Sequence, residues 1–137
     1  MGRTCALVAP VLLLLAGCGH SGPATFPVTG TVTYQGKPLP LGTVMFVAED
    51  GPPSQPAPID AHGVYRLEAV AGKHAVQVIA VPPRPGRPDP SADGGIDYTG
   101  SPEVESLIPA KYNRYHTSGI EVVVQPNAEN TIDIQLE

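Results

Sequence analysis

Val28-Thr-Gly-Thr-Val-Thr-Tyr34 is the segment that decides the fold, because its side chains alternate in character with a period of two. Val28, Val32 and Tyr34 fall on one side of an extended chain, and the three threonines fall on the other. Such alternation, rich in β-branched residues, is typical of a strand with one buried face. The folded part of the chain is therefore predicted to begin with a strand at Val28.

Further segments show the same alternation and are predicted as strands: Thr43–Ala48, Val64–Val70, His74–Val81, Ile120–Gln125 and Thr131–Glu137. In Val64–Val70 we expect Tyr65, Leu67 and Ala69 to point inward. His74–Val81 is apolar on both faces, which predicts a central strand covered on both sides. The last two segments, joined by a short turn, are predicted to form a hairpin. The sequence thus predicts an all-β fold, a single antiparallel β-sandwich of about seven strands.

Segments rich in proline and glycine separate these predicted strands. The 137 residues include 17 prolines and 15 glycines, too many for a helical protein, since both residues weaken helix interiors. Residues 82–102 are predicted to be a long Pro/Gly-rich loop without strand or helix, and long loops inside compact domains are often functional or disordered. Ser101, Pro102 and Glu103 are typical of a helix start, and Pro109 limits that predicted helix to about two turns.

Charge and aromatic content exclude some classes of partner. The net charge is -5 and charged residues make up 15% of the chain, which leaves no basic footprint for nucleic acid. Aromatic residues make up 5% and tryptophan is absent, so no large aromatic platform is expected for stacking bases or sugars.

The N-terminal residues have the pattern of a targeting signal. A short basic start precedes an apolar run from Cys5 to Ala16, which suits a signal-peptide core and is too short for a transmembrane helix. The run ends in Leu15-Ala-Gly-Cys18, which resembles the lipobox of bacterial lipoproteins. That resemblance implies cleavage before Cys18 and a diacylglycerol on its thiol, which would anchor the chain in a membrane. The alternative is an ordinary secretory signal with an incidental Cys18.

These features predict three parts of the chain. Residues 1–17 are a lipoprotein signal peptide, residues 18–27 a flexible tether that carries the lipidated Cys18, and residues 28–137 the β-sandwich. Cys5 would leave with the signal, so the mature domain would hold no thiol for a disulfide, a nucleophile or a metal. Gly19 stands where aspartate signals inner-membrane retention in some bacteria. We therefore expect a cell-envelope location, with the outer membrane favoured.

The strand motifs also carry a family resemblance. The pattern runs from Val28-x-Gly30-x-Val32-x-Tyr34 through Gly36-Lys-Pro-Leu39 to Asp60-x-x-Gly-x-Tyr65. It resembles the carboxypeptidase regulatory-like domain, a transthyretin-type β-sandwich, and Ile108-Pro-Ala-Lys-Tyr-Asn113 resembles a version found in small lipoproteins of planctomycete bacteria. The resemblance implies a non-catalytic module over residues 28–137. The C-terminal Tyr-Arg-Gly-Ser signature of the related hydrolases is missing.

Catalytic and metal-binding patterns are sparse. The histidines 20, 62, 74 and 116 form no zinc-ligand spacing and are predicted to be solvated. A serine triad from Ser106, His116 and Asp97 lacks a nucleophile-elbow context. Asp89, Asp93 and Asp97 lie four residues apart on irregular chain, which makes them calcium candidates, although they lack the EF-hand spacing. The competing interpretation is a solvated, charged loop; no cofactor is expected.

Two groups of residues are candidates for contact with a partner. Arg84 and Arg87 lie among prolines, and a polyproline-like segment can dock in a partner's groove or serve as a spacer. Tyr98, Tyr112 and Tyr115 are candidates for a small contact surface, with core packing as the alternative for Tyr112.

The sequence therefore favours a non-enzymatic, lipid-anchored envelope module with a structural, adhesive or protein-interaction role, its partner an envelope protein or a glycan. The alternative is an envelope lipoprotein that binds a small ligand, a glycan or calcium through residues 82–102. An enzyme ranks third.

Overall fold

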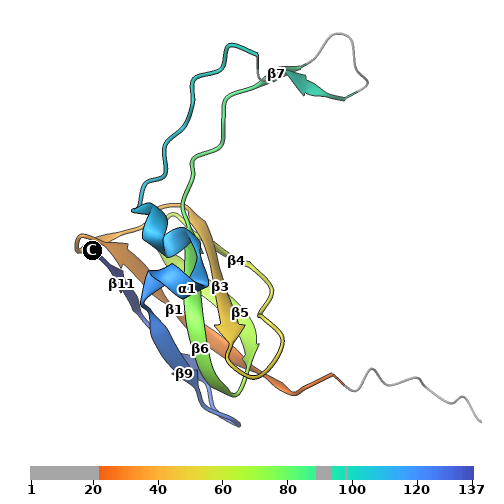
Figure 1. Ribbon diagram of the computed structural model, residues 1–137, viewed down its shortest axis with the longest axis vertical. Coiled ribbons are helices and arrows are strands. Elements are labelled where there is room, and N and C mark those ends of the chain that lie inside the picture. Colours follow the sequence, from red (N-terminus) through yellow and green to blue (C-terminus); the bar gives the residue numbers. More distant parts are fainter. Residues whose placement is uncertain (1–21, 89–93, 98) are drawn as a thin grey trace, which may run out of the picture.

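Two β-sheets pack face to face in the computed structural model, which describes residues 22–88, 94–97 and 99–137 (Figure 1). The predicted all-β sandwich is confirmed. The elements, in chain order, are β1 (Thr25–Tyr34), β2 (Lys37–Pro38), β3 (Gly42–Ala48), β4 (Ala57–Ile59), β5 (Val64–Val70), β6 (Gly72–Ile79), β7 (Arg87–Pro88), β8 (Ile96–Asp97), the 3-10 helix η1 (Ala110–Asn113), α1 (Tyr115–Ser118), β9 (Glu121–Val124), β10 (Asn130–Thr131) and β11 (Ile134–Leu136).

The two sheets differ in topology. In the first sheet, β1 is central and pairs antiparallel with β5, from Thr25 opposite Val70 to Thr31 opposite Val64. On its other side β1 pairs with β10 and β11, and both of these pairings are parallel. The second sheet has the order β4-β3-β6-β9 and is antiparallel throughout.

The core lies between the sheets and is filled by the alternating residues that the sequence marks. Tyr65, Leu67 and Ala69 of β5 are buried, as predicted. Phe46 of β3 reaches Tyr65 across the sandwich, with ring centroids 6.0 Å apart. Burying an aliphatic or aromatic side chain of this size contributes about 1.5–3 kcal/mol, so these side chains hold the two layers together.

The predicted C-terminal hairpin is wrong. β9 pairs with β6 in the second sheet, whereas β11 pairs with β1 in the first. The chain does turn between them, where the Asn130 side chain accepts from Gln125 N and donates to Gln125 O and Ala128 O. Alternation marks a strand but does not name its neighbour, and here each strand extends a different sheet.

The helix predicted after Ser101 is also wrong in position. Residues 101–106 have no helical structure, and Leu107 N donates to Ala80 O at 2.8 Å, which ties this stretch to the end of the β6 segment. Ile108 is buried in the core. Helical turns begin only after Pro109, as η1 and α1, and both pack against β6 (Figure 1). Tertiary hydrogen bonding and burial override the local capping signal.

Two predicted boundaries change. Thr25–Pro27, assigned to the tether, belong to β1 because they pair with β5, and Phe26 packs against the core. Residues 82–102, here called the arm, contain the two-residue ladder β7–β8, although no strand was predicted there. Figure 1 shows the described part of the arm running away from the sandwich.

The outer face of β6 is less covered than predicted. Its inner residues Val76 and Val78 are fully buried, but Ile79 is 40% exposed and the following Val81 43%. The strand is central in its sheet, yet the short helices cover only part of its outer side. The apolar residues on the outer face of this segment therefore form an exposed apolar surface instead of a second buried face.

Candidate functional site

The calcium candidates are only partly described. Asp89 and Asp93, like the lipidation candidate Cys18, lie outside the described residues. Asp97 lies in β8, where its Oδ1 accepts from Thr99 N at 2.7 Å, an Asx-type contact within the arm. Among the residues that the structure describes, no group of three or more His, Cys, Asp or Glu side chains converges to hold a metal ion.

Ser106 and His116 each make local contacts. Ser106 Oγ donates to Ala80 O at 3.4 Å and accepts from Ile108 N at 3.4 Å, so it caps the backbone beside β6. The exposed His116 ring packs edge-on against Tyr115, with centroids 5.2 Å apart. These contacts give both residues a packing or turn role.

His74 is not the solvated histidine that the sequence predicted. It is 1% exposed, because β6 begins at Gly72 and places His74 on the inward face with Val76. Its Nδ1 lies 3.0 Å from Gly72 O, and its ring tilts against Phe46 at 5.8 Å. Among the residues that the structure describes, Nε2 has no hydrogen-bond partner. A carbonyl oxygen only accepts, so Nδ1 must donate to it; with that tautomer Nε2 is an acceptor, and it is buried and unsatisfied.

Exposed apolar side chains gather where the arm leaves the sandwich. Ile79 and Val81 lie on the outer side of the β6 segment, and Leu107, 38% exposed, follows the returning end of the arm. The Leu107 N to Ala80 O hydrogen bond places these residues beside one another. We call Ile79, Val81 and Leu107 the apolar patch.

A groove lies at the other end of β6. It has a volume of about 440 Å³ and is lined by Val47, Ala48, Glu49, Lys73, His74, Ala75, Tyr115 and Glu121. Tyr115 is 46% exposed. Lys73 Nζ lies 3.9 Å from Glu121 Oε2, and both side chains are largely exposed. We call this the Tyr115 groove.

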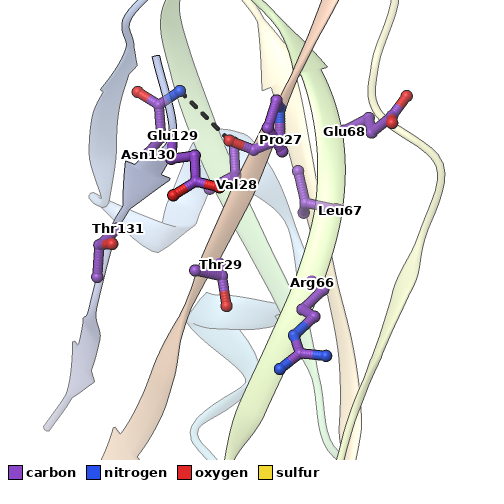
Figure 2. A pocket seen from close by; sticks show the side chains of 9 residues that line it. All are labelled: Pro27, Val28, Thr29, Arg66, Leu67, Glu68, Glu129, Asn130 and Thr131. Carbon is purple, nitrogen blue, oxygen red and sulfur yellow. Dashed lines mark hydrogen bonds between the residues drawn. The ribbon is translucent and has the colours of Figure 1, made fainter.

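A second groove of about 460 Å³ lies on the first sheet (Figure 2). Its walls come from β1, β5 and the turn into β10, and Figure 2 shows Arg66, Glu68 and Glu129 around its rim. Asn130 holds the turn in place, since its Nδ2 donates to Pro27 O at 3.4 Å. The groove is both polar and apolar: carboxylate and guanidinium groups lie at its rim, and Leu67 adds an apolar side chain.

Sequence reasoning named Tyr115 but missed its neighbours Glu49 and Glu121. The three residues come from three separated segments: the β3–β6–β9 pairing brings Glu49 and Glu121 together, and the packing of α1 on β6 adds Tyr115. For Tyr112, the alternative of core packing is confirmed, since the residue is 4% exposed. Its hydroxyl group accepts a hydrogen bond from Glu137 N at 3.0 Å and donates one to Glu137 O at 3.3 Å. Tyr98 lies outside the described residues.

The fold and grooves define an all-β sandwich protein with a surface cleft on each of its two main sheets. No family model and no curated protein matches the chain. Solved structures similar to it include a DUF3823 family protein from Bacteroides ovatus ATCC 8483, with 15% identity over 82% of this chain and a TM-score of 0.44. Another is a DUF3823 family protein from Parabacteroides merdae ATCC 43184, with 13% identity over 83% and a TM-score of 0.42. The chain covers 44% and 46% of those two proteins.

In the part of the chain that the structure describes, no helix has the length and hydropathy needed to cross a bilayer.

Proposed function

We propose that this protein is a non-enzymatic, lipid-anchored module of the cell envelope that acts by binding another protein. The lipobox-like Leu15–Cys18 segment supports the anchor. The apolar patch carries the proposal of a protein contact. Its three members are 40%, 43% and 38% exposed and adjoin one another, and adjoining exposed apolar residues commonly mark interaction sites.

The other sheet supports this choice by contrast. Its outward positions include Thr29 on β1 and the charged Arg66 and Glu68 on β5. Polar and charged residues of that kind are typical of a face that stays in water, whereas interface cores are depleted in charge. The patch is therefore the better docking surface.

The test is crosslinking in cells, followed by mass spectrometry of what co-purifies from detergent-solubilised membranes. Ile79→Lys with Leu107→Lys should abolish recovery of the dominant partner, because each places a charge in the interface. Gln135→Lys is the control, since Gln135 is exposed on β11 of the other sheet. Equal recovery from all three proteins would overturn the proposal.

The anchor has its own test. Cys18→Ser should remove the acyl mass from the N-terminal peptide and release the protein from membranes. Wild-type peptide without an acyl mass would contradict lipidation. An inner-membrane fraction enriched in the protein would contradict the outer-membrane assignment.

A second candidate function is binding of a small ligand, a glycan or calcium through residues 82–102, and the groove in Figure 2 offers a further place for such a ligand. Titration calorimetry with calcium and with cell-wall glycan fragments tests it, with protease cleavage of the arm as a second readout. Binding heat, or ligand-dependent protection of the arm, would favour this second function over a protein contact.

A further inference from the structure

We propose that the Tyr115 groove binds the proline-arginine segment of the arm, residues 82–88, from a second copy of this chain. The inference rests on the proposed protein-binding function and names the partner. The protein would then associate with itself, either as a dimer in which two copies exchange arms or as a chain in which each copy binds the next. Because the apolar patch lies at the base of the arm, the patch of the copy that donates the arm would lie near this interface.

The arm segment has the chemistry of a polyproline ligand. Pro82, Pro85 and Pro88 recur every third residue, and Arg84 and Arg87 recur with the same spacing. A polyproline II helix has three residues per turn, so residues three apart share an edge. From Val81 to Gly86 the chain has neither helix nor strand, and Pro83 to Gly86 are exposed. Before β7 begins at Arg87, the segment thus offers a proline edge made by Pro82 and Pro85, with the exposed Arg84 beside it.

Arg84 is available for such a contact. Within the described part of the chain, no ion pair or hydrogen bond of its guanidinium is seen, and the residue is exposed. Proline also loses little conformational entropy on docking, because its φ angle is fixed before binding. An extended, exposed arm therefore binds a groove at low entropic cost.

The Tyr115 groove has matching chemistry. Grooves that bind polyproline segments are lined by aromatic side chains, and Tyr115 supplies a half-exposed ring. Val47 and Ala75 add apolar contacts. Glu49 and Glu121 supply carboxylates, which arginine binds through charge-assisted and bidentate hydrogen bonds.

One cation, Lys73, also lines the groove. Its contact with Glu121 is long, at 3.9 Å, and the two side chains are 60% and 74% exposed. An exposed pair of this kind contributes little, so Glu121 can turn to an incoming arginine. With Glu49 included, the groove keeps an excess of negative charge for the arm.

The geometry favours a second molecule over the arm of the same one. Val81 and Ala75 are six residues apart along the extended β6 segment, roughly 20 Å. Arg84 is three residues beyond Val81, an extended reach of about 10 Å. The arm also leaves the sandwich in the direction away from α1 (Figure 1). Another copy can present its arm without this constraint.

Charge reversal tests the pairing. The full-length protein, purified from membranes in density-matched detergent, is examined by sedimentation equilibrium. Arg84→Glu with Arg87→Glu should raise the self-dissociation constant by about tenfold or more, equivalent to about 1.4 kcal/mol. Glu49→Arg with Glu121→Arg should do the same, and a mixture of the two variants should associate again. Lys37→Glu with Arg66→Glu is the control of equal charge change.

A synthetic peptide of residues 81–88 provides a second readout. It should compete with self-association, and Tyr115→Ala should weaken peptide binding, whereas a scrambled peptide should have no effect. A monomeric wild type, or self-association unchanged by both charge reversals, would overturn the inference.

The two proposals fail separately. A monomer that still gives patch-dependent crosslinks to another protein overturns the arm pairing and leaves the proposed function standing. A monomer without any crosslinks overturns both.

Discussion

Tyr65 Oη donates a 2.6 Å hydrogen bond to the carbonyl oxygen of Ile132. Tyr65 lies on β5 and Ile132 lies between β10 and β11, so the bond spans the width of the first sheet beneath β1. Gly30 of β1 lies opposite Tyr65 in the β1–β5 ladder. A Cβ at Gly30 would lie 1.8 Å from Ile132 O, so the absent side chain is what lets the carbonyl reach the hydroxyl.

The same contact explains why β10 and β11 are two elements. Ile132 N still donates to Thr29 O at 2.8 Å. The next β1 donor, Thr31 N, is bound by the Asp133 side chain, with Oδ1 at 2.9 Å. The Ile132 carbonyl has turned to Tyr65, and the Asp133 carboxylate accepts the hydrogen bond in the parallel ladder.

Tyr65→Phe should lower the free energy of unfolding by about 1–3 kcal/mol, because it leaves the partly buried Ile132 carbonyl without its donor. Chemical denaturation at neutral pH measures the change. Tyr34→Phe, at a partly buried tyrosine of the same sheet, is the control and should cost less. Equal losses for the two variants would contradict a special role for the Tyr65 bond.

The same residue predicts alkaline behaviour. Burial, followed by the nearby Asp133 charge, raises the pKa of Tyr65 well above its usual value of 10.0. Above about pH 10 the unfolded state releases this proton while the folded state keeps it. The stabilisation is therefore complete below that pH and is lost as pH rises further. Denaturation from pH 8 to 11 should show a steeper decline for wild type than for Tyr65→Phe.

Gly30→Ala should destabilise the protein by about 3 kcal/mol, since the new methyl group meets backbone that must move. Gly36→Ala is the comparison, because its Cβ would meet open space and its cost comes from the positive φ of 77°, which Gly30 does not share. Thermal unfolding of both variants ranks them. A smaller loss at Gly30 than at Gly36 would show that the Ile132 approach is not tight.

His74→Phe should leave stability unchanged or raise it by about 1 kcal/mol, because it removes the unsatisfied Nε2 acceptor and keeps a ring against Phe46. His74→Ala should instead cost about 3 kcal/mol through the cavity it leaves. Urea denaturation of the two variants decides this. A large loss for His74→Phe would mean that the Nδ1 contact with Gly72 O outweighs the buried acceptor.

The turn before β5 predicts acid behaviour. Hydrogen bonds from Val64 N at 2.9 Å and His62 N at 2.8 Å lower the pKa of Asp60 below 3.8. The stabilisation is present above pH 3.8 and is lost as pH falls through the lowered folded pKa. Asp60→Asn, which keeps an oxygen acceptor and does not titrate, should lose less stability than wild type between pH 5 and 2. NMR titration of the Asp60 carboxyl group gives its pKa directly.

The longer strands β1, β3, β5 and β6, the inward residues of β5 and the long excursion at 82–102 could be predicted from the sequence. Period-two alternation reports which side of a strand is buried, and proline reports where regular pairing stops. Both are local properties, so they need no knowledge of the neighbours. The same holds for the lipobox-like segment, which stays a prediction because residues 1–21 lie outside the described residues.

Strand partners and sites were decided by the tertiary structure. Alternation in β9 and β11 is equally consistent with a hairpin, and only the free edges of β6 and β1 place them in separate sheets. His74 became a core residue through the register of β6. The Tyr115 groove depends on β3, β6 and β9 lying side by side. Hydrogen bonds between strands and burial between the two sheets join residues that are far apart in the sequence. They therefore determine strand partners and sites, which the local residue pattern does not determine.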